Sequence, residues 1–214
     1  DNNNHCSDIA FEWDSIYVYR RLKMITHPKM RIHYYQKPFP YSIINNFFDD
    51  KMLEKVSKHT SEMDIGLKKF DPELEKDIRN TFSRTLLSIR EELLKTMKDP
   101  WEHDDSPEDY MIWSNKMQPD TEYKVHQDSM WKRLSLVIYI GKHNAGTLFH
   151  KNENSINSPI GEVDWEHNRG FAFVPGENTW HSYRNIRSYP RETVLINMGP
   201  ANHPVFTEEN NKKY

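Results

Sequence analysis

The chain of 214 residues contains one cysteine, Cys6. A single cysteine excludes an intramolecular disulfide and a thiolate-rich metal cluster, and it is typical of proteins from a reducing compartment. Any bound metal ion would therefore use histidine, aspartate or glutamate side chains as ligands.

The chain also has no run of about 18 apolar residues, which a membrane-spanning helix needs, and its first segment, DNNNHCSDIAFEWDS, contains no apolar signal region. A net charge of -3 gives no dominant basic face, so we predict no nucleic-acid partner. We expect a soluble cytoplasmic protein without membrane association. The sequence does not indicate its oligomeric state.

The composition is that of a globular protein, with 36% hydrophobic, 13% aromatic and 29% charged residues. There is no internal repeat and no low-complexity linker. The length suits one domain with a sizeable core, or one domain with a helical extension, and does not require two domains.

The first half of the chain has the pattern of a strand followed by two helices. Residues 41–48 are rich in apolar side chains and are predicted to form a strand. They lead to Asp49 or Asp50, either of which suits the N-cap of a helix in KMLEKVSKHTSE. Asp71 and Pro72 have the cap and first-position preferences of a second, longer helix. Apolar residues recur along it at spacings of three or four, which predicts that it packs on a sheet. They are Ile78, Phe82, Leu86, Ile89, Leu93 and Met97.

Residues 100–109 contain two prolines and a cluster of acids, so we place a loop there. After this loop the hydrophobic period changes to two, which is the pattern of β-strands. The expected strands are residues 110–118, 123–128, 132–141, 147–152, 169–175 and 191–199. Many short strands joined by polar turns indicate a sandwich, barrel or jelly roll, with the helices on one outer face. The fold class is therefore α+β.

The segment YKVHQDSMW carries a histidine and an aspartate two positions apart. Alternation along a strand predicts that Lys124, His126 and Asp128 point to the same side. His181 follows an apolar strand and a Pro-Gly turn, where a jelly roll could place it beside His126. Two histidines and one carboxylate form the facial triad that holds Fe(II) and leaves coordination positions open, whereas a structural zinc site is closed by a fourth ligand.

An arginine, Arg191, begins the apolar strand that follows His181. Its burial would be unfavourable unless a carboxylate pairs with it. A dicarboxylic co-substrate that chelates the metal at one end and pairs with Arg191 at the other would supply that carboxylate, and its geometry favours arginine over lysine. Arg187 is the alternative arginine for this role.

Four fragments of the second half are YKVHQDSMWKRLSLVIYIG, GTLFHKN, NRGFAFVPGENTWHSY and RETVLINMG. Together they resemble the core of the 2-oxoglutarate/Fe(II)-dependent dioxygenases, in particular the prolyl-4-hydroxylase-like branch. KPFPYSIINNFFDDKMLEKV resembles the strand and helix that often open such domains. The resemblance implies a double-stranded β-helix (jelly roll) core with N-terminal supporting helices packed on one sheet. It implies an N-terminal extension at residues 1–30, a dioxygenase domain at 31–202 with its β-helix core at about 108–200, and a tail at 203–214.

The same resemblance implies roles for individual residues. His126, Asp128 and His181 would be the iron ligands, while Arg191 and Tyr139 would bind the distal carboxylate of 2-oxoglutarate. Asn115, our third co-substrate candidate, lies near the position where members of the family often carry a tyrosine, so the sequence departs from the family pattern there. It departs again at the turn Ala145-Gly146, which is usually Gly-Gly in the family. Asp128 favours oxygenation, because related halogenases carry a small residue in its place.

The implied cofactors are Fe(II), 2-oxoglutarate and O2, and the implied reaction is hydroxylation of an unactivated C–H bond with release of succinate and CO2. Desaturation or epimerisation would leave the same pattern. The substrate is expected to be a small molecule. Basic residues expected near the mouth of the active site favour an anionic metabolite over a protein side chain. These are Lys132, Arg133, Arg184 and Arg187. The candidate substrate contacts are Trp131, Arg133, Arg187 and Asn197.

Two other classes of function remain open from the sequence. One is a cupin-like metalloenzyme without 2-oxoglutarate, in which His150 is a candidate ligand. The other is a jelly-roll module that binds a glycan or peptide through its aromatic residues. Specificity would reside in the first 35 residues and in the loops at 100–109 and 152–167.

Overall fold

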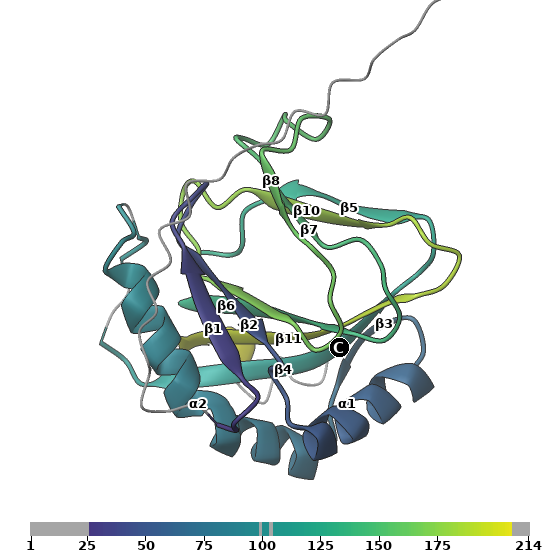
Figure 1. Ribbon diagram of the computed structural model, residues 1–214. Coiled ribbons are helices and arrows are strands. Elements are labelled where there is room, and N and C mark those ends of the chain that lie inside the picture. The colour runs from purple at the N-terminus through teal and green to yellow at the C-terminus, as the bar shows by residue number, and fades with distance from the viewer. Residues whose placement is uncertain (1–25, 99, 103–104, 207–214) are drawn as a thin grey trace, which may run out of the picture.

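The computed structural model describes residues 26–98, 100–102 and 105–206. Two antiparallel sheets face each other, and two helices lie against the outer face of the larger sheet (Figure 1). The larger sheet has the order β1 (Arg31–Tyr35), β2 (Tyr41–Asn45), β9 (Gly170–Phe173), β6 (Leu134–Ile140), β11 (Arg191–Pro200), β4 (Glu108–Met117) and β3 (Gly66–Lys69). The smaller sheet has the order β5 (Thr121–His126), β10 (His181–Asn185), β7 (Thr147–Phe149) and β8 (Gly161–Val163). A short 3-10 turn, η1 (Pro204–Phe206), follows β11.

Both helices begin at aspartate caps, as predicted. The side chain of Asp49 accepts a hydrogen bond from the backbone N–H of Met52 at 2.8 Å and caps α1 (Asp50–Glu62). Asp71 accepts from the N–H of Leu74 at 2.9 Å and caps α2 (Pro72–Leu94). No helix in the described ranges is long and apolar enough to span a bilayer.

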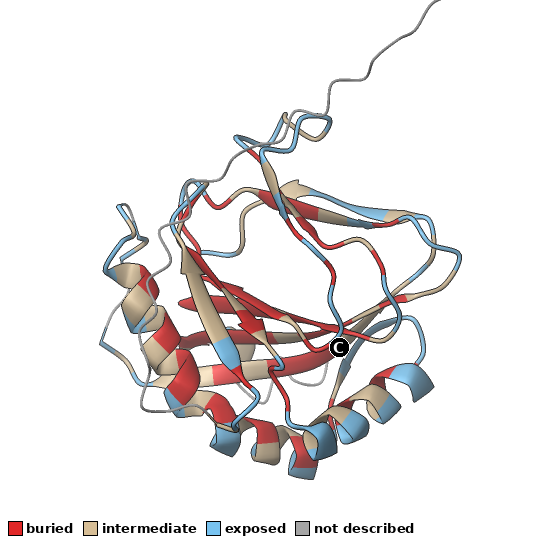
Figure 2. Ribbon diagram, in the orientation of Figure 1, coloured by how far each residue is buried: buried red, intermediate tan, exposed pale blue. Residues whose placement is uncertain are grey.

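The apolar stripe of α2 packs on the larger sheet, as expected (Figure 2). Five of its six residues are buried, and Met97, which lies beyond the end of the helix, is partly buried against the same core. Phe82 stacks on Phe47 with ring centroids 4.4 Å apart. The stripe therefore fixes the helix on the sheet face that points away from the smaller sheet.

Alternation along the strands gives the larger sheet two different faces. Leu136 and Ile138 of β6 belong to the core beneath the helices, whereas Tyr139 belongs to an aromatic cluster between the sheets. On β11, Val194 and Ile196 likewise join the helix-side core. The alternate residues of β11, including Arg191, Thr193 and Asn197, therefore lie on the face toward the smaller sheet. The space between the sheets thus combines aromatic rings with polar side chains.

Four strands were not expected from the sequence: β1, β3, β8 and β10. They are three to five residues long, and β3 is almost entirely exposed, so the apolar alternation that identifies strands is weak in them. Most of the expected N-terminal extension and most of the expected tail lie outside the described residues.

Candidate functional site

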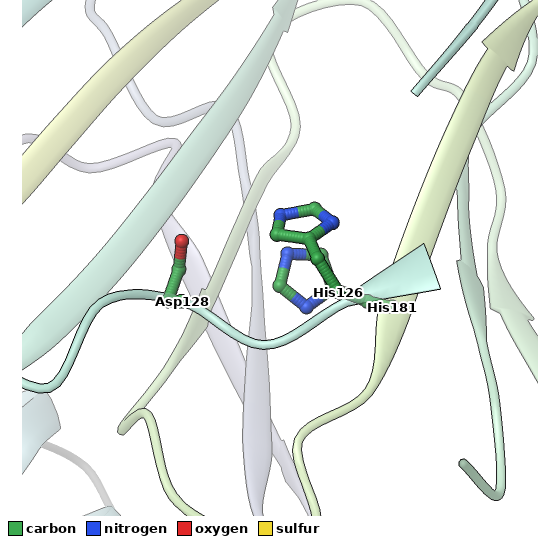
Figure 3. A group of neighbouring side chains, drawn as sticks. All are labelled: His126, Asp128 and His181. Atoms are coloured by element: carbon green, nitrogen blue, oxygen red, sulfur yellow. The ribbon is translucent and has the colours of Figure 1, made fainter. Parts of the chain in front are cut away.

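The side chains of His126, Asp128 and His181 lie close together (Figure 3). Their potential ligand atoms all lie within 4.8 Å of one another. The two histidines are direct partners in the antiparallel pair of β5 and β10, and their ring centroids are 4.2 Å apart. The register of these two strands therefore brings together residues that are far apart in sequence.

Both imidazole rings are oriented by backbone carbonyls. The Nδ1 atom of His126 lies 2.9 Å from the carbonyl oxygen of Lys124, and the Nδ1 atom of His181 lies 2.9 Å from that of Thr179. A carbonyl oxygen only accepts hydrogen bonds, so each Nδ1 must carry the proton. Nε2 is then the unprotonated nitrogen of each ring and can act as a metal ligand.

The protonation states also suit a metal ion. Burial lowers the pKa of His181 to about 4, and burial likewise lowers the pKa of His126. Burial opposes ionisation of Asp128, but the charges of Lys132 and His181 outweigh it and lower the pKa of this carboxyl to about 2. Near pH 7 the site offers two neutral imidazoles and one carboxylate, a donor set suited to divalent iron.

Asp128 reaches the site by a different route from the one that strand alternation predicts. β5 ends at His126, and Lys124 is exposed, so the three residues do not share one strand face. Asp128 lies in the segment that leaves the sheet. The backbone N–H of Arg133 donates to the carbonyl of Met198 at 2.8 Å and ties the end of this segment to β11.

Arg191 is buried beneath three aromatic rings and is only 1% exposed. Its guanidinium carbon lies 4.3 Å from the ring centroid of Tyr183, 5.2 Å from that of Trp165 and 5.6 Å from that of Tyr139. Burial lowers its pKa. The Nε atom donates to the carbonyl of Ala145 at 3.3 Å, but Nη2 has no hydrogen-bond partner.

No carboxylate in the described part of the chain forms an ion pair with Arg191. A buried guanidinium without an anion is unfavourable by several kcal/mol. Arg191 is therefore a candidate residue for binding an anionic group.

The other two co-substrate candidates line the same face as Arg191. Thr193 of β11 is the register partner of both Asn115 on β4 and Tyr139 on β6, so the three form a row across the sheet. The Asn115 amide nitrogen lies 3.5 Å from the Thr193 hydroxyl. Burial raises the pKa of Tyr139 to about 12, and its hydroxyl hydrogen-bonds that of Thr147 at 2.8 Å.

Sequence reasoning missed two aromatic residues that contact Arg191, Trp165 and Tyr183. Trp165 stacks on Tyr139 with ring centroids 4.7 Å apart, but it follows a polar loop that has no periodic pattern. Tyr183 stacks on the exposed Tyr123 at 5.1 Å. Its position two residues after His181 on β10 was the available signal, because the two side chains share a strand face.

The substrate candidates occupy different environments. Asn197 is buried on the inner face of β11. Trp131 stacks on His203 at 5.2 Å and contacts Gly199, so the segment after β11 supports it. Arg133 is buried and pairs with Glu108 at 3.1 Å. Arg187 lines a pocket of about 340 Å³ together with Ala145 and Trp165, which both contact Arg191, whereas none of the three candidate metal ligands lines it.

His150 uses both ring nitrogens within the protein. Nδ1 lies 2.8 Å from the carbonyl of Ser155 and Nε2 lies 2.8 Å from the hydroxyl of Ser182. Neither nitrogen is left for a metal ion, and His150 is not part of the cluster of candidate ligands. The structure therefore gives the cupin-like ligand set no geometric basis.

Of three comparisons with known proteins, the one with solved structures found matches. No family model matches the chain, and no curated protein sequence matches it. Among solved structures, the viral collagen prolyl hydroxylase vCPH from Paramecium Bursaria Chlorella virus-1 aligns with a TM-score of 0.56 and 13% identity, over 75% of this chain and 95% of the viral one. A prolyl-4-hydroxylase from Pseudomonas putida aligns with a TM-score of 0.52 and 16% identity, over 75% and 92% of the two chains.

An oxidoreductase of the 2OG-Fe(II) oxygenase family from Burkholderia pseudomallei aligns with a TM-score of 0.51 and 12% identity, over 74% of this chain and 84% of the other. Identities this low support a shared fold and leave the chemistry to be argued from the site. The chain has the fold of the 2-oxoglutarate/Fe(II)-dependent oxygenases, as its resemblance to the prolyl-4-hydroxylase-like branch predicts.

Proposed function

We propose that the protein is an Fe(II)- and 2-oxoglutarate-dependent oxygenase that hydroxylates an unactivated C–H bond of a small metabolite. One observation carries this proposal: the buried Arg191, which has no anionic partner among the described residues, shares the space between the sheets with the His126, Asp128 and His181 cluster. A metal site alone would fit many reactions. A metal site combined with an anion pocket fits a co-substrate that binds at both.

The residues of the chain would hold the metal ion through the Nε2 atoms of His126 and His181 and a carboxylate oxygen of Asp128. Since the two backbone carbonyls already fix the rings, little side-chain freedom would be lost on binding. The bound ion and 2-oxoglutarate would supply the oxidising chemistry, in which the co-substrate becomes succinate and CO2 and one oxygen atom of O2 enters the substrate.

Arg191 would orient 2-oxoglutarate by pairing with its distal carboxylate through two parallel hydrogen bonds. Tyr139 and Asn115 lie in the adjoining row of the sheet and would contact the same end of the molecule. The rings of Tyr183 and Trp165 cover the guanidinium and would exclude water from the ion pair, which strengthens it. Asp128, a carboxylate rather than a small residue, favours oxygenation over halogenation.

We infer that the two sheets form the double-stranded β-helix expected from the sequence, with β5, β7, β8 and β10 as its smaller sheet. The antiparallel pairing within both sheets and the likeness to solved oxygenases support this description. The prolyl hydroxylases among those structures make a peptidyl proline the natural second candidate substrate.

Binding of 2-oxoglutarate to protein loaded with Mn(II), measured by isothermal titration calorimetry without oxygen, tests the proposal. The wild type should bind Mn(II) and then 2-oxoglutarate. Arg191→Ala should bind 2-oxoglutarate about 10- to 100-fold more weakly, because charge-assisted hydrogen bonds are lost. Arg187→Ala, which removes the alternative arginine, should bind it like the wild type. Equal affinities in Arg191→Ala and the wild type would contradict the proposal. Succinate release in the presence of anionic metabolites or proline-containing peptides then identifies the substrate.

A further inference from the structure

Lys132 places a positive charge beside the candidate metal ligands. It follows Trp131 in the segment between β5 and β6, and its side chain is only 16% exposed. Its Nζ atom lies 2.6 Å from Oδ1 of Asp128, whose side chain is 11% exposed. The ammonium group is thus held next to the carboxylate that would bind the metal ion.

The other three basic residues that the sequence suggested for substrate binding have different surroundings. Arg133 pairs with Glu108 and donates to the carbonyl of Ser106 at 2.8 Å. Arg184 and Arg187 line the 340 Å³ pocket together with the carboxylates Glu162 and Asp164, and none of the candidate metal ligands lines it. Of the four basic residues considered from the sequence, Lys132 is the one whose charge lies at the metal site.

The charge of the loaded site would not be balanced. The ion pair of Lys132 and Asp128 is neutral, while a divalent metal ion and Arg191 bring three positive charges against the two negative charges of 2-oxoglutarate. One net positive charge therefore remains. In addition, Asp128 would share its negative charge with the metal ion, which weakens its compensation of Lys132.

We propose that Lys132 recognises an anionic group of the substrate, such as a carboxylate, phosphate or sulfate, and orients the substrate at the metal site. An ammonium group has three N–H donors, and the hydrogen bond to Asp128 uses one of them. A substrate anion would accept from another and compensate the partly buried charge. This inference rests on the proposed function, because it needs the metal ion and the co-substrate in place.

The alternative role for Lys132 is purely positioning: it would orient Asp128 and contact no substrate. The two roles differ in what the Lys132→Met variant loses. A substrate-binding lysine is needed for anion affinity after metal and co-substrate are bound. A positioning lysine is needed for metal affinity and leaves anion affinity unchanged at saturating metal.

Titration of sodium sulfate into protein saturated with Mn(II) and 2-oxoglutarate, without oxygen and at constant ionic strength, tests the inference by calorimetry. The wild type should show saturable binding of sulfate. Lys132→Met should weaken it about tenfold or more, Lys132→Arg should retain most of it, and Lys151→Met, at an exposed position outside the site, should match the wild type. Circular dichroism and the thermal midpoint of each variant verify that it is folded.

The outcomes separate this inference from the proposed function. If the wild type binds neither Mn(II) nor 2-oxoglutarate, the proposed function fails and the inference fails with it. If both bind, but sulfate binds equally to Lys132→Met and the wild type, or does not bind the wild type, the role of Lys132 in substrate recognition is overturned while the oxygenase proposal stands. Loss of Mn(II) affinity in Lys132→Met with unchanged sulfate affinity would assign Lys132 to positioning only and would also overturn the inference.

Discussion

His126 and His181 face each other across β5 and β10 as direct register partners, and each ring is oriented by the carbonyl two residues before it in the chain. This arrangement leaves Nε2 as the unprotonated nitrogen of both rings before any metal ion is bound. The same local device occurs on two strands, so backbone geometry contributes to the orientation of both rings.

Removal of either histidine should abolish tight metal binding. His126→Ala and His181→Ala each leave two of three ligands, so we expect Mn(II) affinity to fall about 100-fold or more, measured by calorimetry or by electron paramagnetic resonance of the free ion. His167→Ala, at an exposed position outside the site, is the matched control. Affinity equal to that of the control in either variant would exclude that histidine as a ligand.

The stability of the metal-free protein should fall in acid because of His181. Its pKa is about 4 in the folded protein, against an ordinary value of 6.5, so between these values the unfolded state binds a proton that the folded state does not. Unfolding free energy therefore decreases as the pH falls from about 6.5 to about 4, by about 3 kcal/mol for this group. In urea unfolding with a chelator present, the free energy of unfolding of His181→Asn should depend less on pH between about 4 and 6.5 than that of the wild type. The exposed control His167→Asn should follow the wild type. An unchanged slope in His181→Asn would contradict the burial of a neutral imidazole.

The support of the Asp128 segment by Trp131 can be tested at Gly199. A Cβ atom at this position would lie 2.6 Å from Cε3 of Trp131 and 3.0 Å from its carbonyl oxygen, so the tryptophan and its backbone must shift. Gly199→Ala should lower the free energy of unfolding by about 1–3 kcal/mol and weaken Mn(II) binding through displacement of Asp128. Wild-type metal affinity in a destabilised Gly199→Ala protein would show that Trp131 does not position Asp128.

The hydroxyl of Tyr139 should contribute to co-substrate affinity. Tyr139→Phe keeps the ring that stacks on Trp165 but removes the hydroxyl that hydrogen-bonds the hydroxyl of Thr147. We expect 2-oxoglutarate to bind about 3- to 10-fold more weakly to the Mn(II) form, which corresponds to the loss of one hydrogen bond. Tyr34→Phe, which removes a hydroxyl from the helix-side core, is the control and should bind it normally. A Tyr139→Phe affinity within twofold of this control would remove Tyr139 from the co-substrate pocket.

Much of the fold could be predicted because single side chains leave clear local patterns. The aspartate caps at Asp49 and Asp71 and the apolar stripe of α2 identify the helices, and alternation identifies β6 and β11. β10 escaped prediction since HSYRN mixes polar and aromatic residues and its pairing with β5 and β7 is long-range. Local propensity carries no information about such partners.

The site could be predicted in part for the same reason. Residue types and order pointed to His126, Asp128, His181 and Arg191, but the expected strand geometry at Asp128 was wrong because β5 ends two residues earlier. The rings that cover Arg191 come from β6, β10 and the segment after β8, and no sequence spacing relates them. The contact between Lys132 and Asp128 also depends on how the chain leaves the sheet.

The most direct test of the oxygenase proposal is an anaerobic titration of 2-oxoglutarate into Fe(II)-loaded protein, followed by visible absorption. Chelation of iron by the keto acid should produce a charge-transfer band that saturates at one equivalent, and Arg191→Ala should need about 10- to 100-fold more 2-oxoglutarate to reach the same absorbance. A wild-type protein that binds Fe(II) but develops no band would contradict the proposal, as would a band that saturates equally in Arg191→Ala.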